Sequence, residues 1–329
     1  MNYVRYINHL TEPGKEKTLF IQVIILLAGA VLLYIGSEAL VKGSSSTAFL
    51  FAVKPVIVGL TIVSLATSAP ELLVSLVASM KGSGDISIGN ILGSNVINIA
   101  LVLGLTALIS KVEVNKSIVR FELPYMVAVS VLFWFLCKDC RIGIFDGVIL
   151  LSLLVLFLII GIKNAKDKNN SGGPRAEKSF KVLFKNGVFI ITGIIGLAWG
   201  ADLVVRKAIF IAEAIGLSQA FIGISVVAVG TSLPELATSV VAAAKGEGDI
   251  SVGNIVGSNL FNICLVMGSV GILNPARINC SLLYFEIPFM ILLAVLLYIA
   301  SLMKNRLNTF TGVIFILFFI GYISIAYFK

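Results

Sequence analysis

The sequence predicts an all-α integral membrane protein in which ten transmembrane helices form two inverted-topology repeats of five helices. Three observations lead to this fold: an apolar composition, ten apolar segments long enough to cross a bilayer, and a repeat that relates the two halves. Of the 329 residues, 58% are hydrophobic and only 13% are charged, with a mean hydropathy of +1.03. The charged share is about half that of a globular chain. This composition excludes a water-soluble, disordered, fibrous or conventional nucleic-acid-binding protein.

A short polar segment precedes the apolar part of the chain, and a polar linker divides that part. Residues 1–18 are polar and mixed in charge, and residues 163–185 contain K-D-K-N-N-S-G-G-P-R-A-E-K. A helix needs about 20 residues to cross about 30 Å of hydrocarbon. Segments of that kind are predicted at 19–41, 50–79, 84–110, 119–137, 145–162, 186–207, 216–243, 248–274, 282–303 and 308–328. The linker therefore separates a first five-helix repeat, 19–162, from a second, 186–329.

The positive charges predict the orientation in the membrane. The net charge of +8 comes from Lys and Arg residues between the apolar segments, as is typical of the flanks of membrane helices. Counted over alternate sides of the membrane, 15 Lys and Arg lie on the side of the linker and 10 on the other. The positive-inside rule then places the linker in the cytoplasm and the N-terminus outside. We expect a multi-pass protein of the plasma membrane, in contact with the lipid bilayer and not with nucleic acid.

The two halves of the chain are copies of each other. Residues 59–104 align with residues 223–268 at an offset of 164 without a gap, and 27 of the 46 positions are identical. Because five is an odd number of spans, the second copy enters the membrane from the face opposite the first. Inverted repeats of this kind are a recurrent architecture of secondary transporters, whose sites lie near the bilayer midplane. Identity is densest around polar residues in mid-span, which a duplication kept only for packing does not explain.

Each half carries a Thr-Ser-x-Pro-Glu motif near the middle of a long span. The candidate ligands in these motifs are Thr67, Ser68, Glu71, Thr231, Ser232 and Glu235. A carboxylate at bilayer depth is costly and indicates a functional site. The proline before each glutamate lacks an N–H, which frees the carbonyl groups of Ala66 and Gly230. We expect broken helices that present carboxylates, hydroxyls and carbonyl oxygens to a cavity.

The following span of each half adds a second polar face, in the sequence Gly-Ser-Asn-x-x-Asn. Ser94 and Asn98 are four residues apart and so share one helical face, and Ser258 and Asn262 repeat this arrangement. We interpret them as cation ligands rather than only interhelical hydrogen-bonding groups, because they recur beside the carboxylate motif in both halves. The small-xxx-small glycines of the same spans are expected to allow close helix contact; they are Gly89, Gly93, Gly253 and Gly257.

The candidate ligands are all oxygen atoms, which predicts the kind of cation. Hard oxygen ligands without nitrogen or sulfur suit Ca²⁺ or Na⁺ and argue against zinc or copper. Two carboxylates carry a charge of −2, which balances one Ca²⁺ or two monovalent cations. If Ca²⁺ and Na⁺ cannot occupy the site together, they compete for it. Such competition, combined with alternating access, results in exchange of the two ions. No catalytic residue or cofactor is predicted, since the only histidine, His9, lies in the polar N-terminal segment.

Other ionisable residues are expected to lie outside the site. Asp85 and Asp249, each in a G-D-I-S sequence, are interpreted as helix caps or first-turn charges rather than ion-access residues. Four further acids are placed at the membrane interface or given structural roles: Glu38, Asp202, Glu122 and Glu286. Four cysteines form no disulfide framework in a chain of this size. Cys137 and Cys140 have no second pair with which to form a zinc site.

The paired motifs resemble those of the sodium/calcium exchanger family, within the cation/calcium exchanger superfamily. The resemblance rests on A-T-S-A-P-E with G-S-N-V-I-N and on G-T-S-L-P-E with G-S-N-L-F-N, and the short linker is similar to that of prokaryotic members. It implies that Glu71 and Glu235 hold Ca²⁺, helped by Thr67 and Thr231. It also implies Na⁺ sites and a cavity lining built from Ser94, Ser258, Asn98, the backbone carbonyls of Ser64 and Ala228, and the hydroxyls of Ser68 and Ser232. The first and sixth spans would then slide as gating helices.

Two positions depart from the family pattern, and two alternative functions stay open. Ala66 stands where glycine is common, and Asn262 where some archaeal members and the potassium-dependent branch carry aspartate. With no third carboxylate, dependence on K⁺ is not expected. A proton/calcium or other divalent-cation exchanger is the alternative, because a buried glutamate can take up a proton. A cation channel is less favoured, since inverted repeats around a central site favour alternating access.

Overall fold

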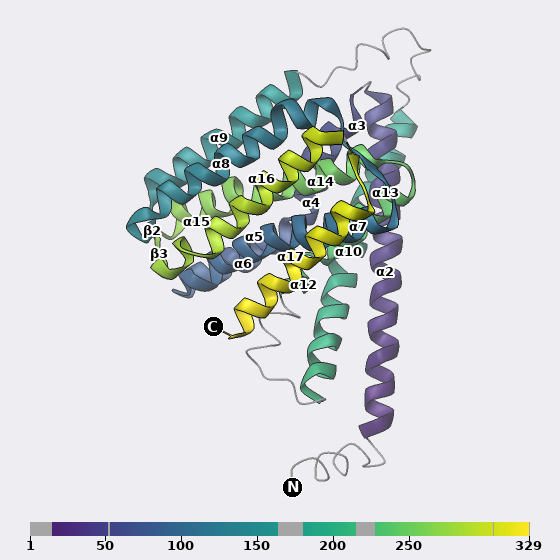
Figure 1. Cartoon of the computed structure of the whole chain (residues 1–329). Coiled ribbons are helices and arrows are strands. Elements are labelled where there is room, and N and C mark those ends of the chain that lie inside the picture. The colour runs from purple at the N-terminus through teal and green to yellow at the C-terminus, as the bar shows by residue number, and fades with distance from the viewer. Residues whose placement is uncertain (1–14, 52, 164–179, 215–227, 305, 329) are drawn as a thin grey trace.

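The computed structural model describes residues 15–51, 53–163, 180–214, 228–304 and 306–328, most of which are helical (Figure 1). The α-helices of the first half are α2 (Lys15–Leu50), α3 (Pro55–Val58), α4 (Ser64–Thr67), α5 (Ala69–Met80), α6 (Gly84–Ile97), α7 (Gly104–Ile109), α8 (Leu123–Leu136) and α9 (Ile144–Lys163). Those of the second half are α10 (Phe180–Ala214), α12 (Ala228–Thr231), α13 (Leu233–Ala244), α14 (Gly248–Leu260), α15 (Gly268–Leu273), α16 (Glu286–Lys304) and α17 (Thr309–Phe328).

Short π- and 3₁₀-helical turns interrupt several of these helices. The π-helical turns are η1 (Gly59–Val63), η2 (Asn98–Leu103), η3 (Ile118–Glu122) and η7 (Phe261–Met267), and the 3₁₀ turns are η4 (Cys137–Asp139) and η8 (Cys280–Leu283). η2 and η7 join α6 to α7 and α14 to α15 at matching places in the two halves. This pair of π-helical turns therefore follows the sequence repeat.

Seven described helices are long and apolar enough to cross a membrane, and the bent pair Pro55–Thr67 and Ala69–Met80 adds an eighth span if counted as one. Two shorter apolar helices, Leu233–Ala244 and Thr309–Ile325, overlap the seventh and tenth predicted spans. The start of the seventh span, most of the predicted linker and most of the polar N-terminal segment lie outside the described residues. An all-helical protein with several apolar spans is thus confirmed.

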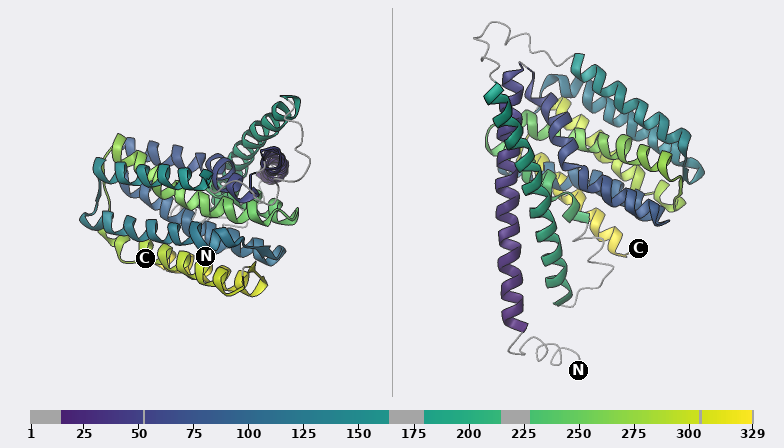
Figure 2. Two further views of the ribbon diagram at one scale, coloured as in Figure 1. Left: turned by 90° about the horizontal axis from the view of Figure 1, so that it is seen from above. Right: turned by 180° about the vertical axis from the view of Figure 1, so that it is seen from behind.

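The two longest helices, α2 and α10, lie side by side at one edge of the molecule (Figure 2). A Cβ atom at Gly36 would lie only 2.7 Å from the backbone nitrogen of Leu197, so glycine is what allows the two backbones to approach. α2 extends to Leu50, nine residues beyond the predicted end of the first span at 41. The helix continues because its polar end is packed inside the protein, with Ser44 fully buried.

Two short antiparallel sheets join the halves at opposite ends of α8. β1 (Val112–Glu113) pairs with β4 (Arg306–Leu307), and β2 (Arg141–Ile142) pairs with β3 (Ala276–Arg277). β1 and β3 occupy matching positions of the sequence repeat, and so, with a one-residue shift, do β2 and β4. Each sheet therefore links one strand of the first half to one strand of the second.

A disulfide links Cys140, just before β2, to Cys280, just after β3. The four cysteines alone did not predict this bond, because β2–β3 pairing brings together residues that are 140 positions apart, with a Cα–Cα distance of 5.2 Å. Cys137 and Cys264 are buried free thiols. Of the two cysteines in the Cys-x-x-Cys sequence, Cys137 is therefore a packing residue and Cys140 forms a crosslink.

Replacing both Cys140 and Cys280 by serine is expected to lower thermal stability while leaving ion transport intact. A disulfide typically contributes about 2–4 kcal/mol, mainly by restricting the unfolded chain. The melting temperature of the purified double variant should therefore fall below that of the wild type. Reduction of the wild type should remove the difference. Equal melting temperatures under oxidising conditions would contradict this role.

Candidate cation site

Both Thr-Ser-x-Pro-Glu segments are broken helices, as predicted. In the first half the helix axis bends by 45° between Pro55–Thr67 and Ala69–Met80. Ser68 at this break has φ −83° and ψ 3°, and Ser232 at the matching break has φ −88° and ψ 7°. Each proline lies in the first turn of the new helix, where a missing N–H breaks no helical hydrogen bond. Each glutamate lies in the same first turn, where the helix dipole favours a negative charge.

The spans that contain α6 and α14 supply the second polar face and are the most buried of the seven long apolar helices among the described residues. In each of them, Gly84–Ile109 and Gly248–Leu273, 83% of the most apolar 18-residue stretch is buried. Ser94, Asn98, Ser258 and Asn262 are each at most 1% exposed. Asn98 begins the π-helical turn η2, and Asn262 is the second residue of η7. Such turns within α-helices are frequent at functional sites.

The Glu235 carboxylate is surrounded by hydroxyl groups from both halves. The hydroxyls of Ser68 and Ser258 each donate a hydrogen bond to Glu235 Oε1 at 3.3 Å. Thr67 Oγ1 lies 3.3 Å from Ser258 Oγ and donates to Asn254 Oδ1 at 3.1 Å. Glu235 is fully buried. The first half therefore completes the surroundings of the second half's carboxylate.

The Glu71 carboxylate has the related arrangement with the halves exchanged. Ser94 Oγ donates to Glu71 Oε1 at 3.4 Å and lies 3.5 Å from Thr231 Oγ1. Glu71 is also fully buried. The sequence spacing predicted that Thr67 shares one helical face with Glu71. In the structure the Thr67 hydroxyl contacts Ser258 of the other half. Local spacing does not predict this contact, because it depends on how the two halves pack against each other.

Five buried oxygen atoms of predicted site residues have no hydrogen-bond partner in the described part of the chain. They are Glu71 Oε2, Glu235 Oε2, Asn98 Oδ1, Asn262 Oδ1 and Ser232 Oγ. Buried polar atoms are nearly always paired, because an unpaired one costs free energy. All five are oxygen atoms of the kind that bind Ca²⁺ or Na⁺. The residues therefore fit such a cation as transported substrate.

The two predicted carbonyl ligands are placed differently. The carbonyl oxygen of Ser64 accepts the Ser68 N–H at 2.9 Å and the Thr67 hydroxyl at 3.3 Å. Both contacts come from its own segment. Ala228 begins α12. Roles for these carbonyls in binding Na⁺ stay predictions.

Asparagines that were not singled out in the sequence support the site. Asn254 accepts the Thr67 hydroxyl and donates to Ser239 Oγ at 3.0 Å. Its counterpart Asn90 donates to Ser75 Oγ at 3.0 Å. These residues are identical in both repeats. That identity is the signal by which they could have been found.

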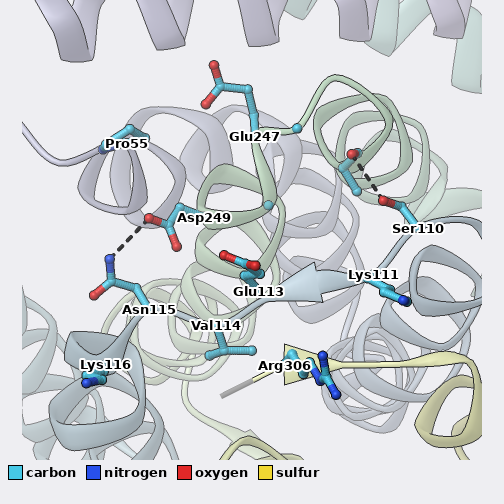
Figure 3. Close-up of a pocket in the computed structure, with 13 residues that line it drawn as sticks. Pro55, Ser110, Lys111, Glu113, Val114, Asn115, Lys116, Glu247, Asp249 and Arg306 are labelled. Atoms are coloured by element: carbon cyan, nitrogen blue, oxygen red, sulfur yellow. Dashed lines mark hydrogen bonds between the residues drawn. The ribbon is translucent and has the colours of Figure 1, made fainter. Parts of the chain in front are cut away.

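Asp85 and Asp249 hold loops of the opposite half. Asp249 Oδ2 accepts a hydrogen bond from Asn115 Nδ2 at 3.2 Å (Figure 3), and Asp85 Oδ1 accepts one from the backbone N–H of Asn279 at 2.6 Å. Both aspartates lie in the first turn of their helices, as predicted. Their side chains bind the opposite half of the protein rather than capping their own helices, because each aspartate lies beside a loop of the other half.

A pocket of about 1170 Å³ lies at the β1–β4 end of the protein (Figure 3). It is lined by both acidic and basic side chains, namely Glu113, Glu247, Asp249, Lys111, Lys116 and Arg306. Within the described residues, no three His, Cys, Asp or Glu side chains are grouped to hold a metal ion.

Comparison with known proteins shows what the chain is similar to. A family model described as "sodium/calcium exchanger protein" matches residues 21–163 and 185–328. The putative antiporter CaxA of Alkalimonas amylolytica is 34% identical over 312 residues, which cover 92% of this chain and 98% of that protein. The sodium/calcium exchanger MaX1 of Methanosarcina acetivorans is 29% identical over 346 residues, with 93% and 98% covered.

The similarity extends to a solved structure. The sodium-calcium exchanger NCX_Mj, soaked with 10 mM Na⁺ and no Ca²⁺, matches with a TM-score of 0.82 at 31% sequence identity. The match covers 93% of this chain and 99% of that one. Nearly the whole architecture is therefore shared.

Proposed function

Because the chain belongs to the sodium/calcium exchanger family, we propose that it is a secondary active antiporter that exchanges Na⁺ for Ca²⁺ at the site between its halves. The observation that carries the proposal is the set of buried site oxygens without hydrogen-bond partners among the described residues. The site's two glutamates balance one Ca²⁺ or two Na⁺, so the two loads compete for the same oxygens. Exchange follows when the site opens to one side of the membrane at a time.

The proposed ligands follow the two motifs. Ca²⁺ is held by Glu71 and Glu235 with the hydroxyls of Thr67 and Thr231. Na⁺ uses the remaining oxygen ligands: Ser68, Ser232, Ser94, Ser258, Asn98, Asn262 and the carbonyls of Ser64 and Ala228. Oxygen-only coordination of this kind suits both ions.

The proposed topology is ten spans in two inverted repeats, 19–162 and 186–329, with a cytoplasmic linker at 163–185 and the N-terminus outside. The disulfide supports this orientation. Cys140 precedes α9, and Lys163 at the other end of α9 leads into the linker, so the disulfide and the linker lie on opposite sides of the membrane. Disulfides persist in oxidising compartments and not in the cytoplasm. The disulfide side is therefore assigned to the outside.

Contacts of α2 support alternating access, because they break the symmetry between the halves. Lys245 Nζ lies 2.7 Å from Glu38 Oε1, and Ser45 donates to Glu247 Oε1. Both contacts hold α2 against the turn between α13 and α14, on the proposed cytoplasmic side. In α10, the counterpart of Glu38 is Asp202, which pairs with Arg206 of its own helix. This difference favours a state in which the inner side is closed.

Replacing Glu38 by glutamine is expected to shift the protein toward an inward-open state. The ion pair is partly exposed to solvent, which screens it, so its loss should shift the equilibrium only modestly. A cysteine at Ala242, which is buried in one apolar cluster with Leu40 of α2, should react faster with a maleimide from the cytoplasmic side. Asp202→Asn is the control and should leave labelling unchanged. Equal labelling in all three proteins would count against the contact as a gate.

The transport proposal is tested by ⁴⁵Ca²⁺ uptake into proteoliposomes of the purified protein. An outward Na⁺ gradient should drive uptake, and a pH gradient alone should not. Uptake driven by the pH gradient and not by Na⁺ would identify a proton/calcium exchanger instead. Flux that needs no counter-ion would identify a channel.

A further inference from the structure

Four asparagine side chains form a connected network where α6 and η2 meet α14 and η7. Asn98 Nδ2 donates to Asn259 Oδ1 at 3.1 Å, and Asn262 Nδ2 donates to Asn95 Oδ1 at 3.0 Å. Asn95 and Asn259 also donate to each other's backbone carbonyl oxygens, both at 3.4 Å. All four side chains are at most 2% exposed. Every one of these bonds joins one half of the chain to the other.

In this network the amide nitrogens of Asn98 and Asn262 donate hydrogen bonds, and their amide oxygens are left available. Asn98 Oδ1 and Asn262 Oδ1 are buried and have no hydrogen-bond partner among the residues that the structure describes. A primary amide has donors on one side and an acceptor on the other, so holding the nitrogen sets the direction of the oxygen. If the amide turned over, its NH₂ group would replace the oxygen and repel a cation.

We propose that Asn95 and Asn259 are positioning residues for the cation site. Asn259 holds the amide of Asn98, and Asn95 holds the amide of Asn262, so that oxygen rather than NH₂ faces the transported ion. Each half thereby sets the ligand geometry of the other half. The proposal rests on the proposed cation site and deepens it, because it explains how two neutral asparagines become oriented ligands.

Simple packing at the helix crossing would predict a different pattern of effects. A residue that only fastens α6 to α14 would change ion affinity equally in any background. A positioning residue acts through one particular amide, so its effect disappears once that amide is removed. The structure specifies the partners: Asn259 pairs with Asn98, and Asn95 pairs with Asn262.

The test is a double-mutant cycle on Ca²⁺ and Na⁺ dissociation constants, measured with the purified full-length protein by ⁴⁵Ca²⁺ equilibrium dialysis and competition with Na⁺. Asn259→Leu and Asn98→Ala are each expected to raise the dissociation constant of at least one ion by about tenfold, the size of one lost charge-assisted contact. The variant carrying both changes should match Asn98→Ala alone. Asn95→Leu with Asn262→Ala should behave in the same way.

The matched control combines Asn95→Leu with Asn98→Ala, which lie in one helix but are not hydrogen-bonded through their side chains in the network. Their effects on the dissociation constants should multiply. Multiplicative effects in all three pairs, or equal coupling in all three, would overturn the positioning role. If a leucine variant does not fold, alanine at the same position removes the same amide and serves instead. Because the readout is equilibrium binding, failure of Na⁺-driven uptake by the wild type would sink the transport proposal and leave this test intact.

Discussion

Replacing Glu71 or Glu235 by glutamine is expected to abolish Na⁺-driven Ca²⁺ uptake while the protein stays folded. Glutamine keeps the size of the side chain but removes one of the two charges that balance Ca²⁺. Losing one partner of a buried charged pair costs about 2–5 kcal/mol, which is roughly 30-fold to several thousand-fold in affinity. Uptake of ⁴⁵Ca²⁺ into proteoliposomes measures the loss directly.

Thermal stability separates loss of binding from loss of folding. A neutral amide is less costly to bury than a carboxylate, so the melting temperature without ions should be at least that of the wild type. Ca²⁺ should raise the melting temperature of the wild type and leave that of either variant unchanged, because a ligand stabilises only the protein that binds it.

Glu122→Gln is the matched control for the glutamate variants. Glu122 is also a buried carboxylate, 4% exposed, and its Oε2 has no hydrogen-bond partner in the described residues. It lies in η3, outside both Thr-Ser-x-Pro-Glu motifs. Its variant should transport Ca²⁺ as the wild type does. Wild-type uptake by Glu71→Gln or Glu235→Gln, or loss of uptake in Glu122→Gln, would refute the site assignment.

Replacing Gly257 by alanine is expected to lower both stability and ion affinity. Its Cβ atom would lie 2.5 Å from Ser64 Oγ and 2.8 Å from the carbonyl oxygen of Leu60. Neither can move freely, since both lie in the segment against which α14 packs. Overpacking of this kind costs about 1–3 kcal/mol. It also displaces the neighbouring Ser258, which donates to Glu235.

The measurements are the melting temperature and the Ca²⁺ concentration for half-maximal uptake. Gly321→Ala in α17 is the control, because Gly321 is exposed and a Cβ there meets no described atom within 4 Å. That variant should match the wild type in both measurements. A Gly257→Ala protein with wild-type stability and affinity would show that α14 does not pack as closely as the structure indicates.

The repeat made the local features of the site predictable. Each Thr-Ser-x-Pro-Glu segment is a broken helix, as the motifs indicated, with the break at Ser68 or Ser232 and the glutamate in the first turn of the new helix. Burial of Glu71 and Glu235 also follows the sequence, because both lie within long apolar segments. These properties depend on residues a few positions apart, and local spacing encodes them.

Contacts between side chains of the two halves were not predictable from local spacing. The pairing of Thr67 with Ser258, and the disulfide between Cys140 and Cys280, join residues separated by 191 and 140 positions. A repeat shows that two segments are alike and does not show which side chains meet. Asp85 and Asp249 lie in the first helical turn, as expected, but their hydrogen bonds to loops of the other half were not predictable for the same reason.

The amino-acid sequence by itself determined the membrane class of this protein, its two similar halves and the oxygen atoms available to a cation, because composition and short spacing are sufficient for these. Only the tertiary structure decided which hydroxyl accompanies which carboxylate and which asparagine holds another. Those contacts form where α6, α14 and the two broken helices interlock, and their geometry arises from packing over distances that no local pattern spans.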